Sequence, residues 1–300
     1  MTSSEGSGAG DLRAAIDEAT RVLAGAGIAS ARTDAEALAA HALGVTRGEL
    51  ARRAVLGGPV PAGFGDLVAE RARRVPLQHL TGRVGFRGLE LRVGPGVFVP
   101  RPETEVVAGL AIEAARALAG CAPLVVDLCA GSGAIALAVA AEVPGARVVA
   151  LEVDRAALAW AERNLAEAPD GARVELRRGD VAGAGTGVLA DLRGAADVVV
   201  ANPPYIPPGE EPLEEEVRGH DPARALYGGG PDGMAVPAAV VATARALLRP
   251  GGVLVMEHAD RQGRAARALV DTADWDQSRT VPDLAGRDRV LVARRTGAGE

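Results

Sequence analysis

The tetrapeptide Asn202-Pro203-Pro204-Tyr205 has the residue types and spacing to hold a flat nitrogen group. It follows 197–201, an apolar run that predicts a buried parallel strand. Each proline fixes φ at about −65° and removes a backbone donor, which leaves the carbonyls of Asn202 and Pro203 free of any sheet ladder. With the Asn202 side-chain oxygen, three acceptors converge beside the Tyr205 ring. This predicts a corner that holds a planar –NH2 group, although prolines also end strands at ordinary turns.

A second chemical element lies upstream, where a strand at 124–128 runs into a glycine-rich turn and then a helix. The turn consists of Cys129, Ala130, Gly131, Ser132 and Gly133, and Asp127 lies at the end of the strand before it. Glycines let a backbone approach a ligand closely, and a helix N-terminus offers unpaired donors. The turn therefore predicts a cofactor site, in which Asp127 suits a cationic amino group.

Two further acids follow neighbouring strands. Glu152 ends the next strand, where an acid accepts bonds from both ribose hydroxyls in nucleotide-binding βαβ units. Asp180 follows the third strand and can accept from an adenine amino group, although a loop-capping Asp is an equally good interpretation. Residues 131–136 also fit the dinucleotide fingerprint of nicotinamide dehydrogenases. Asp127 beside a pyrophosphate and the lack of a hydride-transfer acid count against that alternative.

Alternating elements position these residues. Strands are expected at 124–128, 147–151, 173–176, 198–201, 253–256 and 289–293, and helices at 134–142, 155–167, 237–248 and 261–270. Such alternation predicts an α/β fold with a doubly wound, Rossmann-like parallel sheet.

The N-terminal part has a different character. Residues 1–10 predict a disordered tail, and 11–82 a small all-helical domain in which Thr33 and Thr46 are candidate N-caps. Residues 83–100 predict a β-hairpin linker that includes Val97-Phe98-Val99. The remaining span, 101–300, is then a single catalytic domain.

Composition excludes several classes of function. All 33 basic residues are Arg, so Schiff-base chemistry and a phosphate-loop lysine are impossible. The net charge of −6 argues against a large nucleic-acid surface, and no apolar run reaches membrane-spanning length. Cys121 and Cys129 flank one strand, about 26 Å apart if extended, so we expect free thiols. We expect no metal site, no membrane, a monomer and a cytoplasmic protein.

Together these residues resemble the release-factor glutamine N5-methyltransferase family, which uses S-adenosylmethionine. Asn-Pro-Pro-Tyr at a strand end is shared with other methyltransferases that act on planar amino or amide nitrogen. Further motifs make the chain resemble the glutamine N5-methyltransferases in particular. They are Arg32-Thr33-Asp34-Ala35-Glu36, Pro76 to Gly82, Pro100-Arg101-Pro102-Glu103-Thr104-Glu105 and Asp283 to Arg289.

The resemblance implies a role for each motif. The 129–133 backbone and Asp127 would hold the methionine end of the cofactor, Glu152 the ribose, and Asp180 and Val181 the adenine. Asn202 and the Pro203 carbonyl would hold the substrate amide, within a pocket that Pro204, Tyr205, Phe98, Arg101 and Glu103 complete. The substrate would be the Gly-Gly-Gln glutamine of class 1 peptide-chain release factors, and the helical domain would grip a second surface of that partner.

Some features leave alternatives open. An adenine-N6 methyltransferase acting on DNA or RNA would use the same corner, because adenine also presents a planar amino group. The segment 206–233 is a candidate lid or substrate loop. Its acidic stretch, 210–216, favours a solvated loop over partner binding.

Overall fold

The computed structural model describes residues 11–118 and 122–297. The predicted tail at 1–10 and the thiol of Cys121 lie outside the described residues. The described residues form two compact units. The first comprises the described residues up to Arg83 together with Leu213–His220, and the second comprises Val84–Pro212 and the described residues from Asp221 onward.

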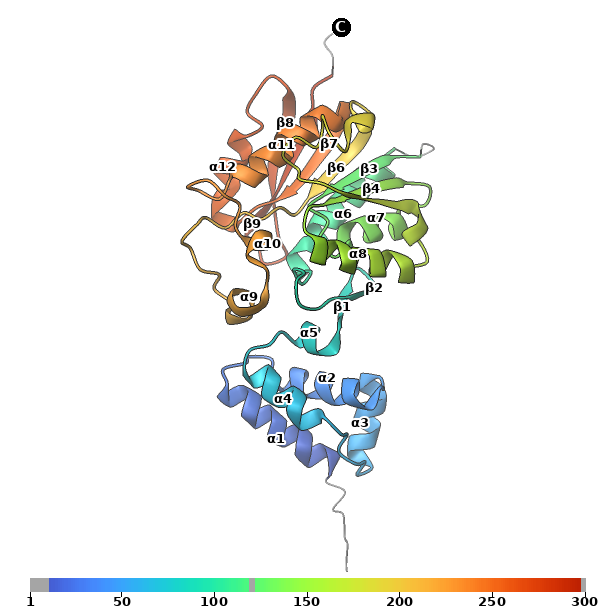
Figure 1. The fold of residues 1–300 in the computed structure, drawn as a ribbon, viewed down its shortest axis with the longest axis vertical. Coiled ribbons are helices and arrows are strands. Elements are labelled where there is room, and N and C mark those ends of the chain that lie inside the picture. Colours follow the sequence, from blue (N-terminus) through green and yellow to red (C-terminus); the bar gives the residue numbers. More distant parts are fainter. Residues whose placement is uncertain (1–10, 119–121, 298–300) are drawn as a thin grey trace, which may run out of the picture. The chain divides into compact units, whose positions relative to one another are not determined.

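The first unit is a small helical bundle, whose helices from the N-terminal part of the chain are drawn in blue and cyan in Figure 1. Its helices are α1 (Leu12–Gly25), α2 (Ala31–Leu43), α3 (Arg47–Val55), α4 (Phe64–Ala72), α5 (Leu77–Thr81) and, from the later segment, α9 (Glu215–His220). Leu12, Ile16 and Leu23 recur at helical spacing and are buried in its core. Thr46 caps α3 as predicted, by accepting a bond from the Glu49 amide at 3.2 Å. The predicted cap at Thr33 is wrong, because α2 already begins at Ala31.

The segment 206–233 is not a structureless connection. It contains α9 and α10 (Ala223–Leu226), and Leu213–His220 clusters with the helical unit. There Glu216 binds Arg71 and Arg74, each at 2.9 Å, with a side chain only 17% exposed. For Glu216 the prediction of a solvated acid is therefore wrong. The prediction of a single domain over 101–300 did not assign Leu213–His220 to the helical unit.

The second unit carries a seven-stranded sheet with the order β5-β4-β3-β6-β7-β9-β8. Its strands are β3 (Leu124–Leu128), β4 (Arg147–Glu152), β5 (Val174–Arg178), β6 (Ala196–Ala201), β7 (Leu248–Glu257), β8 (Trp275–Pro282) and β9 (Asp288–Arg295). β3 to β7 pair in parallel, whereas β9 is antiparallel to β7 and to β8. The doubly wound α/β prediction is confirmed, with an antiparallel edge added.

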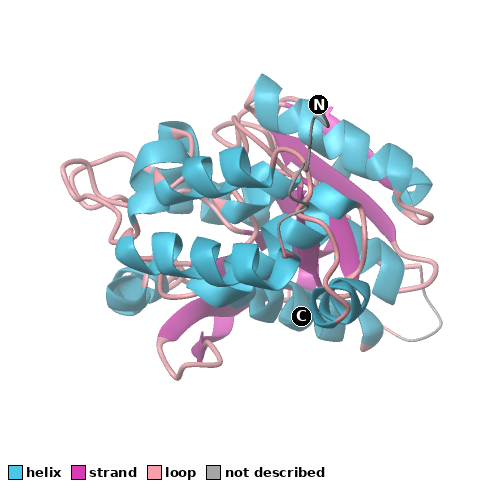
Figure 2. Cartoon of the chain, turned by 90° about the horizontal axis from the view of Figure 1, so that it is seen from below, coloured by secondary structure: helices cyan, strands magenta, loops and turns pink. Residues whose placement is uncertain are grey.

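Helices cover both faces of this sheet, as the colouring by secondary structure in Figure 2 also shows. On one face lie α6 (Pro102–Arg116), α7 (Ala134–Glu142) and α8 (Arg155–Glu167), and on the other α11 (Ala235–Leu247) and α12 (Gly263–Ala268). Successive residues of a strand point to opposite faces of the sheet, so Val125 packs towards α6 and α7, and Val126 towards α11. Figure 1 shows the two layers in green and orange.

Two predicted details differ from the structure. The hairpin is confined to β1 (Arg83–Phe86) and β2 (Leu89–Arg92), and Val97-Phe98-Val99 forms no strand. β8 was missed because it is an edge strand with mostly exposed side chains, so it shows no alternation of apolar and polar residues.

Candidate functional site

The candidate site lies where parallel strands end. Leu128 of β3 is in register with Leu151 of β4 and Ala201 of β6, and Ala201 is in register with Met256 of β7. Residues that directly follow these positions therefore meet at one edge of the sheet. In doubly wound folds this edge is where ligands bind.

The turn after β3 is held in a strained shape. Cys129 has φ 66°, in the left-handed region that non-glycine residues rarely adopt, and Gly131 and Gly133 have φ 58° and 82°. The Ala130 amide donates to the Leu151 carbonyl at 2.9 Å, which ties the turn to β4. The Ser132 carbonyl accepts from the Asn164 side chain of α8 at 2.9 Å. The turn is thus fixed by its neighbours before any ligand arrives.

Asp127 lies under this turn and is completely buried. Its Oδ2 accepts from the Ala136 amide of α7 at 3.1 Å, whereas its Oδ1 has no hydrogen-bond partner. Burial raises the pKa of this carboxyl to about 8. An unpartnered buried oxygen is destabilising unless a ligand supplies the donor, so Asp127 is suited to receive a cationic group.

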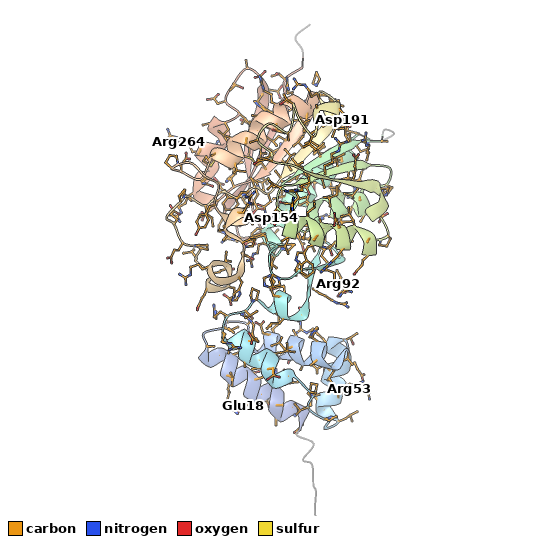
Figure 3. All side chains as sticks on the ribbon, viewed as in Figure 1. Glu18, Arg53, Arg92, Asp154, Asp191 and Arg264 are labelled. Atoms are coloured by element: carbon orange, nitrogen blue, oxygen red, sulfur yellow. The ribbon has the colours of Figure 1, made fainter. Side chains whose placement is uncertain are left out.

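Glu152 is also buried, but the protein already uses most of its acceptor positions. Oε1 accepts from the amides of Val153 and Asp154, at 2.8 and 2.7 Å, and Oε2 accepts from the Gly131 amide at 2.8 Å. Asp154 itself caps α8, and Figure 3 labels it beside the sheet. A carboxylate has about four acceptor positions, so one remains for a ribose hydroxyl. Glu152 thus joins β4 to the glycine turn in addition to its predicted contact with ribose.

The two residues predicted to border an adenine lie after β5. Asp180 is exposed and its Oδ1 accepts from the Ala182 amide at 2.9 Å, so it caps its own loop. Val181 is buried, and its carbonyl accepts from the Thr243 hydroxyl at 2.7 Å. Gly179 links this loop to the Glu152 carbonyl at 3.0 Å. The loop is therefore anchored to β4, and its contact with adenine stays a prediction.

The Asn-Pro-Pro-Tyr bend is fixed by a later stretch of chain. The amides of Tyr205 and Ile206 both donate to the Leu226 carbonyl, at 3.1 and 2.8 Å. Gly228 and Gly233 pack so closely that a Cβ would lie 2.7 Å from the Pro204 carbonyl and 2.2 Å from the Tyr205 carbonyl, respectively. Only glycine fits there, so the bend has a rigid backing.

Two residues that sequence reasoning missed support the bend. The Asn202 side-chain nitrogen is 3.1 Å from the Thr104 hydroxyl of α6, and that hydroxyl is 2.8 Å from Glu257 Oε2 at the end of β7. The Tyr205 hydroxyl is 3.4 Å from Glu257 Oε1. The parallel pairing of β6 with β7 places Asn202 beside Glu257, and the sequence alone carries no signal of that pairing.

The other predicted pocket residues are engaged in ion pairs and ring contacts. Arg101 lies 5.2 Å from the centre of the Phe98 ring and binds Asp221 at 2.9 Å. Glu103 binds Arg287 at 2.9 Å. These contacts hold the 221 and 283–287 loops, and a role of Phe98, Arg101 or Glu103 in binding substrate stays a prediction.

Comparison with known proteins identifies the chain. The PrmC N-terminal domain family matches residues 14–82, and the methyltransferase small domain family matches 105–214. The release factor glutamine methyltransferase of Streptomyces coelicolor is 50% identical over 286 residues, which cover 95% of this chain and 98% of that protein. The chain belongs to the release factor glutamine methyltransferase family.

The chain is similar to further methyltransferases. The release factor glutamine methyltransferase of Mycolicibacterium smegmatis is 48% identical, with 95% of this chain and 98% of that protein covered. A 4-amino-L-phenylalanine/4-methylamino-L-phenylalanine methyltransferase of Streptomyces pristinaespiralis is 42% identical, with 95% of each covered. A solved protein-(glutamine-N5) methyltransferase of Alicyclobacillus acidocaldarius has a TM-score of 0.41 at 26% identity, covering 68% of this chain and 99% of that one.

Family membership confirms the methyltransferase prediction and sets the dehydrogenase alternative aside. Methyltransferases of this family use S-adenosylmethionine, and the residues present fit it. The unpartnered Oδ1 of Asp127 suits the amino group of the methionine end, and Glu152 retains an acceptor position for the ribose. Among the described residues there is no cluster of metal-ligand type, and no described helix is both long and apolar enough to cross a bilayer.

Proposed function

We propose that this enzyme transfers a methyl group from S-adenosylmethionine to the side-chain amide nitrogen (N5) of the Gly-Gly-Gln glutamine of class 1 release factors. The observation that carries the proposal is the Asn202 carboxamide, whose nitrogen is bound to Thr104 within the protein. Its Oδ1 is thereby directed away from Thr104, available to an incoming amide.

The chemical difficulty lies in the nucleophile, because an amide nitrogen shares its lone pair with the carbonyl. Asn202 Oδ1 and the Pro203 carbonyl would accept the two N–H bonds of the glutamine amide. That arrangement turns the nitrogen lone pair outward and meets the positive charge that develops there with fixed dipoles. A rigid bend performs this well because its dipoles need no reorganisation during the reaction.

Bound S-adenosylmethionine supplies an electrophilic methyl group on a sulfonium whose leaving thioether is neutral, so the donor side needs no acid. The nitrogen gains the methyl group and then loses one proton. A methylated, positively charged amide is strongly acidic, so water accepts that proton. The chain has no Lys to act as a strong base, and burial raises the pKa of Tyr205 above its ordinary value, which keeps its hydroxyl protonated.

We propose further roles on the same basis. The turn 129–133, Asp127, Glu152, Asp180 and Val181 bind the cofactor, and Tyr205 and Phe98 wall the substrate pocket. The helical unit grips a second surface of the release factor. The enzyme acts as a monomer, without nucleic acid, in the cytoplasm where release factors work.

Labelled-methyl transfer tests this function. The enzyme is incubated with labelled S-adenosylmethionine and, separately, a release factor, the same factor with its tip glutamine changed to alanine, adenine-containing DNA, and 4-amino-L-phenylalanine. We expect label only on the unaltered factor, at the tip glutamine in peptide mapping. Label on DNA would instead support the adenine-N6 alternative, and label on the free amino acid would place this chain with its Streptomyces pristinaespiralis relative.

A further inference from the structure

Three side chains from three different elements form a chain of hydrogen bonds that leads from the bend into the buried interior. Asn202 follows β6, Thr104 lies in the first turn of α6, and Glu257 ends β7. Thr104 and Glu257 are each only 3% exposed. The distances along the chain are 3.1 Å from Asn202 Nδ2 to Thr104 Oγ1 and 2.8 Å from Thr104 Oγ1 to Glu257 Oε2.

The direction of these bonds follows from counting donors and acceptors. An ionised carboxylate only accepts, so Glu257 takes the single hydroxyl hydrogen of Thr104. Thr104 then has no hydrogen left for Asn202 and must accept from the Asn202 –NH2 group. The opposite carboxamide orientation would set two acceptors, Oδ1 and the Thr104 oxygen, against each other.

We infer that Thr104 and Glu257 are positioning residues that fix the Asn202 carboxamide with its oxygen towards the substrate. This inference rests on the proposed function, since the oxygen that they direct is the one that holds the glutamine amide. The two residues act through Asn202 and need not touch the substrate. They explain how a freely rotating amide, with two ends of nearly equal shape, presents only one of them.

The same carboxylate also serves the other end of the bend. The Tyr205 hydroxyl lies 3.4 Å from Glu257 Oε1, within reach of a weak bond. Glu257 is therefore a common acceptor for the first and the last side chain of the tetrapeptide. Losing its charge would loosen the ring as well as the carboxamide.

The hydrogen bonds that link Glu257, Thr104 and Asn202 depend on pH, because they depend on the charge state of Glu257. Burial raises the pKa of Glu257 to about 7, opposed by the Thr104 bond and by Arg289 of β9, and assisted by Glu103 of α6. Protonated Glu257 can donate to Thr104, whose hydrogen then turns to Asn202 and favours the reversed carboxamide. We expect turnover to fall as the pH drops through about 7.

The test compares Thr104→Val, which is nearly isosteric but lacks the hydroxyl, with Thr104→Ser, which keeps it. Thr296→Val is the control, since Thr296 also donates a side-chain bond, to the Ala273 carbonyl, on the far part of the same unit. At saturating cofactor we expect Thr104→Val to lower kcat about 10-fold, with cofactor Kd and Tm near wild type, and Thr104→Ser to restore most of the rate.

The pH profile supplies a readout that a merely structural role would not move. In Glu257→Gln the side chain no longer ionises, so kcat should lose the fall between about pH 8 and about pH 6 that the wild type shows. A folded Thr104→Val enzyme with wild-type kcat, equal defects in the Val and Ser variants, or an unchanged acid fall in Glu257→Gln would each overturn the inference.

A measurement without turnover separates this inference from the proposed function. With nitrogen-15 label on asparagine, the Asn202 –NH2 hydrogen bound to Thr104 should exchange slowly in the wild type and in Thr104→Ser, and quickly in Thr104→Val. Fast exchange in the wild type would contradict the positioning of Asn202 by Thr104 even if release factors are methylated. Slow exchange would support it even if the substrate proves to be another amide.

Discussion

Asp127 and Glu257 are two buried carboxylates at the same edge of one sheet, and the protein uses them in opposite ways. Asp127 has one oxygen bound to the Ala136 amide and one without a partner, and its pKa is raised to about 8. Glu257 has both oxygens within reach of protein hydroxyls, and its pKa is raised to about 7. In both, burial is the main cause of the shift.

The difference shows how to distinguish an acid that binds a ligand from one that orients a neighbour. Removing a carboxylate from water is unfavourable, and the protein compensates only where it supplies donors. Where it leaves an oxygen unpartnered, as at Asp127, the missing donor belongs to the ligand. Where protein donors reach both oxygens, as at Glu257, the carboxylate fixes the groups that donate to it, and Glu152 does the same while it keeps one acceptor position for a ligand.

The largest effect should come from the group that Glu257 orients. Asn202→Ala removes the directed carboxamide oxygen, and losing one preorganised dipole typically lowers turnover about 100-fold to 1,000-fold. Cofactor affinity should stay within several-fold. Calorimetry measures cofactor affinity and labelled-methyl transfer measures turnover. Turnover close to wild type would contradict the role assigned to the carboxamide.

Asp127→Asn should give the next largest effect, and on binding rather than turnover. It keeps an acceptor for Ala136 but removes the charge, so we expect cofactor affinity to fall about 10-fold to 100-fold at alkaline pH. In the wild type, Asp127 must lose its proton to bind a cation, so affinity should weaken as pH falls below about 8. Calorimetry across pH measures this, and a wild-type profile with the opposite slope would show that Asp127 does not bind the cation.

Glu152→Ala should weaken cofactor binding about 10-fold, through loss of a charge-assisted bond to ribose and of the bond that holds the Gly131 amide. The matched control is Asp154→Ala, which removes a neighbouring acid that caps α8 without contacting the turn. Unchanged cofactor affinity in Glu152→Ala would show that the ribose assignment is wrong.

A partly buried acid extends the comparison to the helical unit. Glu216 is paired with Arg71 and Arg74, so its charge is balanced by the protein. Glu216→Ala should lower the free energy of unfolding by about 1–3 kcal/mol, because Arg71 loses a buried partner. Glu215→Ala, at a side chain 59% exposed, should have little effect. Urea denaturation of the two variants measures the difference, and equal midpoints would contradict the pairing.

Sequence reasoning reached the sheet and the residues that end its strands, because apolar runs and glycine or proline punctuation are local signals. It identified Asn202 but not Thr104 or Glu257, since their contact depends on the pairing of β6 with β7 and on where α6 begins. It predicted that Glu216 is solvated, which is wrong, because Glu216 pairs with Arg71, 145 residues earlier in the chain. Long-range pairs of this kind leave no pattern in a single sequence.

A structure of the enzyme with S-adenosylhomocysteine and a Gly-Gly-Gln peptide tests the central claim most directly. The account predicts the glutamine amide nitrogen within hydrogen-bond distance of both Asn202 Oδ1 and the Pro203 carbonyl, facing the sulfur of the cofactor. An amide bound elsewhere, or a bend that faces away from the 129–133 turn, would contradict it.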